Sequence, residues 1–152
     1  MKKILTTSFI CILIDQIIKI IITTNLKFTE SINVIKNFFR ITYLQNNGAA
    51  FSILSGNRIF LILITLIALL IIYIFLIKNK NINKIEAICY GTLIGGIIGN
   101  LIDRVRLGYV IDYLDFNIIN YNYPVFNFAD ICIVVSAILL LIISIKEVKH
   151  GN

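Results

Sequence analysis

The sequence predicts an all-α integral membrane protein with four membrane-spanning helices in a single domain, residues 1–152. Hydrophobic residues make up 59% of the chain and the mean hydropathy is +0.92, which is more apolar surface than a soluble core of this size can bury. The apolar residues also fall into four runs, each long enough to cross a bilayer at about 1.5 Å per residue.

The four expected helices cover about residues 4–24, 59–77, 86–103 and 128–145. The first follows two lysines, and because no small-residue cleavage site follows it, we expect an uncleaved helix rather than a signal peptide. The helices are separated by two longer loops, residues 25–57 and 104–126, and by a polar connector, residues 78–84.

The first long loop is expected to contain some regular structure. Ile32 and Val34, then Phe39, Ile41 and Tyr43, alternate with polar residues as in short strands. Residues 49–54 could form one or two helical turns, whereas no pattern can be interpreted in residues 116–123.

The distribution of positive charge predicts that both termini are cytoplasmic. In that orientation the short inner segments, residues 1–3, 78–84 and 146–152, together hold seven Lys. The two outer loops are several times longer in total, yet they hold only five Lys and Arg. Cytoplasmic segments of membrane proteins are enriched in Lys and Arg, so the long loops are expected to lie outside.

Four of the eight acidic residues lie between Gly99 and Asp130, beside apolar runs. Counted outward from the inner charges at about 1.5 Å per residue, Asp103 and Asp130 both lie near the outer boundary of a bilayer core about 30 Å thick. Lys19 lands at a similar height, with Asp15 one turn lower. Polar groups from three helices are therefore expected to converge near the outer boundary, where intramembrane charge usually serves function.

Asp112 and Asp130 are the candidate catalytic pair. Only a short loop, residues 113–129, separates them, so the chain can bring their carboxyl groups together. Two carboxylates in contact cannot both ionise readily, so one can act as acid while the other acts as base on a water, which suffices to cleave a peptide bond. The single histidine, His150, lies in the tail, which leaves little for a histidine triad or a zinc site.

Each of these acids also has a purely structural interpretation. Asp130 could serve only the start of the last helix, with Asn127 as N-cap. Asp112 or its neighbour Asp115 could form an ordinary ion pair with Arg104 or Arg106.

Other polar positions have similar structural interpretations. Asp15 and Lys19, spaced i and i+4, could form an internal ion pair with the lysine snorkelling outward. Asn46-Asn47-Gly48 is a turn signal, with Asn47-Gly48 suited to positive φ. Asn100 and Asp103 share a helix face and could, with Arg104, position the segment that carries Asp112.

Small residues are expected to serve packing. The third helix carries a small-residue stripe at Gly91, Gly95 and Gly99, with Gly96 beside it, and such stripes let helices approach closely. The three cysteines, Cys11, Cys89 and Cys132, lie in apolar runs and are interpreted as small apolar residues of the core.

Several function classes are excluded or disfavoured. No basic aromatic patch indicates a nucleic-acid partner. We expect no metal and no organic cofactor, although Asp103, Asp112 and Asp130 could offer oxygen ligands to a divalent ion. A proton- or cation-coupled transporter is the rival class, but such proteins usually show repeated halves and midplane sites, and neither is visible here.

Five segments, in order along nearly the whole chain, resemble the lipoprotein signal peptidases, or signal peptidase II, of bacterial inner membranes. They are Asp15-Gln16-Ile17-Ile18-Lys19, Asn46-Asn47-Gly48-Ala49-Ala50-Phe51-Ser52, Gly99-Asn100-Leu101-Ile102-Asp103-Arg104, Val110-Ile111-Asp112-Tyr113 and Tyr123-Pro124-Val125-Phe126-Asn127-Phe128-Ala129-Asp130. Tyr113 and Tyr123 stand where the family more often has phenylalanine.

The resemblance implies an aspartic endopeptidase that cuts prolipoproteins just before a diacylglyceryl-modified cysteine, with Asp112 and Asp130 as the catalytic dyad. It implies the following residues as lining or supporting the site: Asp15, Lys19, Asn46, Gly48, Asn100, Asp103, Arg104 and Asn127. The implied fold adds a small extracytoplasmic β-cradle and a short surface helix, which fits residues 26–58. We expect a monomer in the bacterial inner membrane, in contact with membrane lipids, with its site near the periplasmic face.

Overall fold

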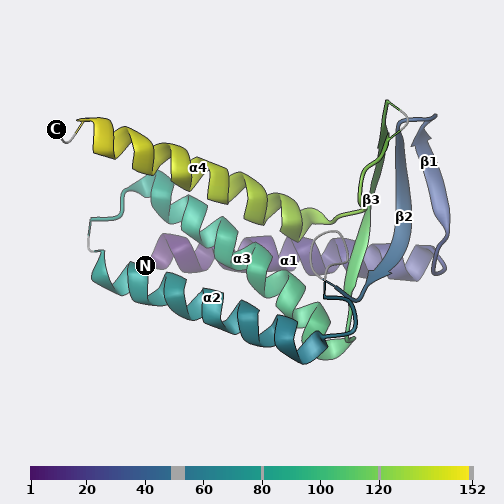
Figure 1. The fold of residues 1–152 in the computed structure, drawn as a ribbon, viewed down its shortest axis with the longest axis horizontal. Coiled ribbons are helices and arrows are strands. Elements are labelled where there is room, and N and C mark those ends of the chain that lie inside the picture. The colour runs from purple at the N-terminus through teal and green to yellow at the C-terminus, as the bar shows by residue number, and fades with distance from the viewer. Residues whose placement is uncertain (49–53, 80, 120, 151–152) are drawn as a thin grey trace.

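The computed structural model describes residues 1–48, 54–79, 81–119 and 121–150, with side chains to residue 146. In these residues four helices form a bundle, and four strands form a small sheet across one end of it (Figure 1). The elements are α1 (Lys2–Asn25), β1 (Ser31–Ile35), β2 (Phe39–Asn46), α2 (Arg58–Lys78), α3 (Lys84–Arg106), β3 (Val110–Ile118), β4 (Tyr121–Asn122) and α4 (Phe128–His150). The expected helical membrane fold with a small β-cradle is confirmed.

All four helices are long and apolar enough to cross a membrane, and α3 is the central one. In α3, 44% of the most apolar stretch is buried inside the protein. The corresponding share in α2 is only 11%. Ile67, Leu70 and Ile71 of α2 are exposed, as expected for side chains that face lipid. Both termini lie at the end of the bundle away from the sheet (Figure 1).

The third helix is longer than the hydropathy pattern predicted, because both of its ends are capped. At its start Asn83 and Glu86 form a capping box, so α3 begins at Lys84 rather than near residue 86. At its end, the guanidinium of Arg58 in α2 donates to the carbonyl oxygens of Arg104 at 2.8 Å and Val105 at 2.7 Å. Arg104 is therefore helical and does not belong to the loop expected from residue 104.

The small-residue stripe of α3 is a helix-packing surface, as expected. A Cβ atom at Gly95 would lie 2.7 Å from Cys11 Cβ and 2.8 Å from the Ser8 carbonyl oxygen in α1. On the other side, a Cβ at Gly96 would lie 2.5 Å from the carbonyl oxygen of Ala129 in α4. The backbone of α3 thus approaches both neighbouring helices more closely than any side chain would allow.

The sheet is antiparallel with the order β1-β2-β3-β4. The expected strands in the first long loop are confirmed as β1 and β2. Residues 110–118, however, were expected to be part of a loop, and they form β3, where Asp112 stands opposite Leu44. The alternation that identifies a half-exposed strand is lost in β3, because Asp112 and Asp115 are buried as fully as the apolar Val110 and Ile111.

An apolar cluster fixes the sheet to the end of α1. Its buried members are Ile22 of α1, Leu26 just after that helix, Tyr43 of β2, and Ile111 and Tyr113 of β3. The strands that carry polar site residues are therefore held on the same rigid body as the bundle.

Two further expectations concern individual residues. Cys11, Cys89 and Cys132 are all buried and unpaired, as expected for core residues. The helical turns expected at residues 49–54, and with them the short surface helix, fall almost entirely outside the described residues.

The close approach of α3 to α1 predicts that Gly95→Leu destabilises the protein by about 2 kcal/mol or more, because an added side chain must push the α1 backbone away. Ala137→Leu, at an exposed position of α4, is the matched control and should leave stability nearly unchanged. Both variants are unfolded by heating in detergent. The reaction of their buried cysteines with a thiol probe reports the unfolding temperature. Equal unfolding temperatures for the two variants would contradict this packing.

Candidate active site

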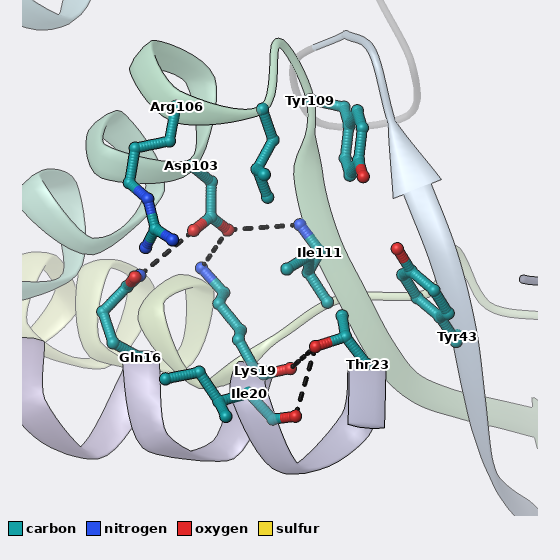
Figure 2. Close-up of a pocket in the computed structure, with 10 residues that line it drawn as sticks. Gln16, Lys19, Ile20, Thr23, Tyr43, Asp103, Arg106, Tyr109 and Ile111 are labelled. Atoms are coloured by element: carbon teal, nitrogen blue, oxygen red, sulfur yellow. Dashed lines mark hydrogen bonds and ion pairs between the residues drawn. The ribbon is translucent and has the colours of Figure 1, made fainter. Parts of the chain in front are cut away.

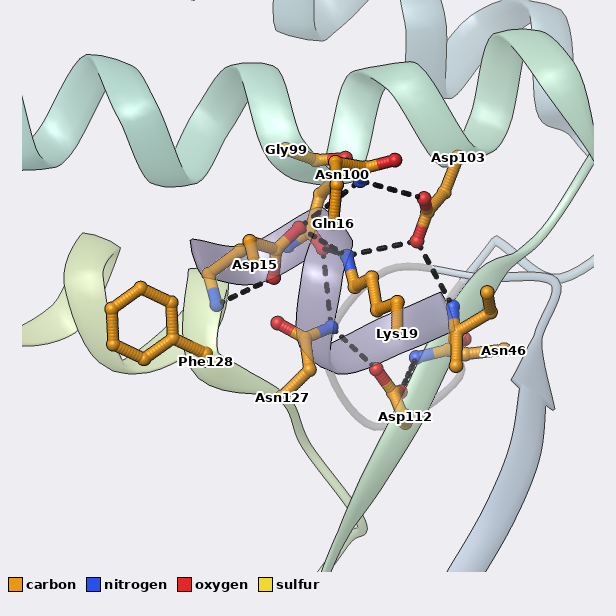
Figure 3. Close-up of polar contacts among 12 residues, drawn as sticks. Asp15, Gln16, Lys19, Asn46, Gly99, Asn100, Asp103, Asp112, Asn127 and Phe128 are labelled. Atoms are coloured by element: carbon orange, nitrogen blue, oxygen red, sulfur yellow. Dashed lines mark hydrogen bonds and ion pairs between the residues drawn. The ribbon is translucent and has the colours of Figure 1, made fainter. Parts of the chain in front are cut away.

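Polar side chains from α1, α3, α4, β2 and β3 converge at the end of the bundle that the sheet covers (Figure 3). The cluster consists of Asp15, Gln16, Lys19, Asn46, Asn100, Asp103, Asp112, Asn127 and Asp130. The expected meeting of polar groups from three helices is thus confirmed, and two strands add to it.

Asp112 extends from β3 and is held by two amide groups. Asn46 Nδ2 donates to its Oδ2 at 2.9 Å, and Asn127 Nδ2 donates to its Oδ1 at 2.7 Å. The side chain is 3% exposed. Burial and, next, the negative charge of Asp130 raise the pKa of Asp112 to about 7, although both amide hydrogen bonds oppose the shift. Asp112 can therefore hold a proton near neutral pH.

Asp130 lies in the first turn of α4 and takes part in the helix cap. Its backbone N–H donates to Asn127 Oδ1 at 3.0 Å, and Asn127 N–H donates back to Asp130 Oδ2 at 3.1 Å. The expected N-cap is confirmed, but it uses only one carboxylate oxygen. The other oxygen, Oδ1, accepts from Asn100 Nδ2 at 2.8 Å.

Asn127 joins the two acids. Its side chain is fully buried, and its Nδ2 donates both to Asp112 and to Asn100 Oδ1 at 3.1 Å. Through its backbone N–H and its Oδ1 the same residue also contacts Asp130. Asp112 and Asp130 are thus brought together on opposite sides of one asparagine, and the charge of one affects the pKa of the other.

Lys19 is buried at the centre of the cluster and does not snorkel outward as expected. Its Nζ lies 2.8 Å from Asp15 Oδ2, 2.8 Å from Asp103 Oδ2 and 3.1 Å from Asn100 Oδ1. The expected i, i+4 ion pair with Asp15 is present. The lysine turns inward because three acceptors match the three protons of its ammonium group, which compensates the cost of burial.

Asp103 connects this ion cluster to the strand that carries Asp112. Its Oδ2 accepts from the backbone N–H of Ile111 at 3.2 Å, and its Oδ1 accepts from Gln16 Nε2 at 3.1 Å. The start of β3 is therefore fixed by Asp103, one of the residues expected to position this segment. Gln16 was not among the expected site residues, although it is a polar residue beside Asp15 within an apolar run and belongs to the first segment that resembles the family.

Asp15 ties α1 to the start of α4. Its Oδ1 accepts from the backbone N–H of Ala129 at 3.2 Å. The absence of a side chain at Gly99 is necessary here, because a Cβ would lie 2.6 Å from Asp15 Oδ2.

Arg104 and Gly48 form one edge of the cluster. Arg104 Nη2 donates to the Gly48 carbonyl oxygen at 3.0 Å, while Gly48 N–H donates to Asn46 Oδ1 at 2.9 Å. The expected turn is thus closed by the Asn46 side chain. The Arg104 Nε atom is buried and has no hydrogen-bond partner among the described residues.

Asp115 is separate from the cluster. It pairs with Arg40, whose Nη2 lies 2.7 Å from its Oδ2, and it accepts from Thr42 Oγ1 at 3.0 Å. The ordinary ion pair considered for Asp112 or Asp115 thus exists only at Asp115, and with a different arginine. Across the described part of the chain, no group of three or more His, Cys, Asp or Glu side chains has the arrangement of a metal site.

Comparisons with known proteins agree with this geometry. The sequence profile of the family described as Signal peptidase (SPase) II matches residues 7–146. A lipoprotein signal peptidase of Halothermothrix orenii is 43% identical over 94% of this chain and 95% of its own length. One of Staphylococcus aureus is 40% identical over 91% of this chain and 85% of its own length.

Two solved structures described as bacterial membrane enzymes have the same fold. One superposes with a TM-score of 0.91 at 36% identity and covers 100% of this chain and 93% of that chain. The other has a TM-score of 0.86 at 37% identity and covers 97% and 95%. With the family profile and the relatives, they show that this chain belongs to the signal peptidase II family, as a multi-pass bacterial membrane peptidase.

Proposed function

We propose that this peptidase, which as a signal peptidase II removes signal peptides from prolipoproteins, uses an aspartic mechanism with Asp112 and Asp130 as the catalytic dyad. The observation that supports this proposal is the shared contact of both acids with Asn127. That contact places both carboxyl groups beside one asparagine, and the charge of Asp130 raises the pKa of Asp112.

In the proposed resting state Asp112 is protonated and Asp130 is ionised. This assignment rests on the pKa of Asp112, which burial and the charge of Asp130 raise to about 7. Asp130 takes a proton from a water whose oxygen attacks the scissile carbonyl carbon, while Asp112 donates its proton to the carbonyl oxygen. When the carbon–nitrogen bond breaks, Asp130 gives its proton to the leaving amine and Asp112 recovers one from the hydroxyl. One water is consumed, and both acids return to their starting states.

The amides and the ion cluster have positioning roles in this proposal. Asn46, Asn100 and Asn127 orient the carboxyl groups of the dyad through neutral hydrogen bonds. Lys19, with its two carboxylate partners, fixes the relative position of α1 and α3, on which those amides depend. Arg104 Nε has no hydrogen-bond partner among the described residues, and we propose that it donates to a carbonyl oxygen of the substrate.

We further propose that the substrate's diacylglyceryl chains stay in the bilayer and that the cleaved bond precedes the lipid-modified cysteine. The bundle end that carries the sheet would face the periplasm, with both termini in the cytoplasm. The placement of both termini at the opposite end of the bundle supports this orientation, as does the excess of Lys in the short segments (Figure 1). Since every polar group of the site comes from one chain, the enzyme is proposed to act as a monomer.

Asp112→Asn and Asp130→Asn should each reduce cleavage of a lipidated precursor by about a thousandfold or more, because each removes an acid–base group. Asp115→Asn is the matched control, since Asp115 lies on the same strand but pairs with Arg40 outside the cluster. It should retain cleavage within a few-fold of wild type. The purified variants are compared in lipid, with unfolding temperature as the test of folding. Substantial cleavage by either dyad variant would contradict the mechanism.

The cleavage rate should fall as the pH rises above about 7, because Asp112 then loses the proton that the mechanism requires. Asn46→Leu should move this alkaline limb to higher pH, since the amide of Asn46 stabilises the ionised form and lowers the pKa of Asp112. The measurement is kcat against pH for wild type and variant. An alkaline limb that stays in place, or moves to lower pH, would contradict the assignment of the proton to Asp112.

Asp15→Asn should produce a milder loss of activity than either dyad substitution, because Asp15 contacts the backbone of α4 but not the dyad carboxylates. Lys19→Met should instead lower stability by about 3–5 kcal/mol, since two buried carboxylates lose their cation. Unfolding temperature and kcat are measured for both. An Asp15→Asn enzyme as inactive as Asp112→Asn would show that Asp15 takes part in the chemistry.

A further inference from the structure

A second polar pocket, of about 200 Å³, lies between the ends of α1 and α3 and the strands β2 and β3 (Figure 2). Lys19, Asp103, Tyr43 and Ile111 form its buried floor. Its rim is made of exposed residues, namely Ile20, Thr23, Arg106 and Leu107. Neither Asp112 nor Asp130 lines it, so this pocket is separate from the proposed dyad.

The charged groups on the floor of the pocket already have partners. Lys19 is held by Asp15 and Asp103, and Asp103 also accepts from Gln16 and from the Ile111 backbone. Tyr109, another lining residue, stays neutral, because a hydrogen bond to Tyr43 raises the pKa of Tyr109 to about 12. The floor therefore offers a ligand no free cation, because its one ammonium is shared by two carboxylates, Asp15 and Asp103.

The remaining cation in the pocket is the guanidinium of Arg106 on the rim (Figure 2). Arg106 is exposed, and no ion pair joins it to another described residue. It is also the last residue of a membrane-spanning helix, which places it at the level of lipid headgroups. A guanidinium binds phosphate through two parallel N–H bonds, so this position suits the phosphate of a lipid.

One electrostatic effect opposes the binding of a phosphate here, and the structure reduces it. The carboxyl ends of α1 and α3 carry partial negative charge, which disfavours an anion nearby. On α3, however, Arg58 covers the carbonyl oxygens of Arg104 and Val105. The apolar rim residues Ile20 and Leu107 can then contact the glycerol and upper acyl region of the same lipid.

We propose that this pocket binds the headgroup phosphate of an anionic glycerophospholipid through Arg106. The ligand is a bilayer lipid and not the substrate, because a diacylglyceryl group carries no phosphate. The proposal does not depend on the catalytic dyad, and a binding measurement can test it without any cleavage.

The experiment titrates the purified full-length protein in detergent with short-chain phosphatidylglycerol and follows its unfolding temperature. A ligand that binds the folded state raises this temperature in a saturable manner. Phosphatidylcholine of the same chain length should have a much weaker effect. Arg106→Gln should raise the half-saturating concentration of phosphatidylglycerol about fivefold, the contribution of roughly one basic residue near an anionic lipid, and Arg106→Lys should restore part of the loss.

Lys27→Gln is the matched control, because it removes one exposed positive charge just beyond α1 and outside the pocket. It should leave the titration unchanged. An unaltered titration in Arg106→Gln, an equal loss in Lys27→Gln, or an equal effect of phosphatidylcholine would each overturn the proposal. Glycerol 3-phosphate without acyl chains should give no shift at these concentrations. An equal, Arg106-dependent shift would overturn the lipid as the occupant in favour of a soluble phosphate.

Discussion

The buried ammonium group of Lys19 is the interaction on which the rest of this structure depends. Four carboxylates gather at one end of an apolar bundle, and such a group could not be buried without a cation among them. Lys19 contacts Asp15 on its own helix, Asp103 on α3, and Asn100, which in turn contacts Asp130 on α4. A single side chain therefore connects the three helices that carry the site, and backbone N–H groups from α4 and β3 supply further donors.

The four carboxylates of the cluster are of two kinds, which differ in the partners that hold them. Asp15 and Asp103 each lie 2.8 Å from the Lys19 ammonium, whereas Asp112 and Asp130 are held by neutral asparagine amides. A carboxylate that faces amides in a buried site has less compensating positive charge, so it shares a proton more readily with a second acid. In the proposed mechanism, this difference gives a physical reason why two of the four neighbouring aspartates act in acid–base chemistry while the other two hold the scaffold.

The sequence was sufficient for the parts of this structure that depend on helix length and on the cost of charge in a membrane. The four helices follow from hydropathy, and the common level of Asp103 and Asp130 follows from counting turns. It was not sufficient for β3, because Asp112 and Asp115 are buried alongside apolar neighbours and the strand shows no alternation. The inward turn of Lys19 was also not predicted, since the sequence of one helix cannot show that Asp103 and Asn100 lie opposite it on another helix.

Asn127 explains why the relative position of Asp112 and Asp130 does not depend on the conformation of the long segment between them. The N-cap of a helix has a fixed position relative to the first turn, so Asp130 is placed in the first turn of α4 by the same hydrogen bonds that begin the helix. The amide nitrogen of that cap residue is then free to hold Asp112, at 2.7 Å. The separation of the two carboxyl groups is thus set by side-chain and helix-cap dimensions, although the whole segment 113–129 lies between them in the sequence. Any change at Asn127 therefore alters the start of α4 and the relation between the acids together, and its effect on activity cannot be assigned to one of these roles without a measurement of the other.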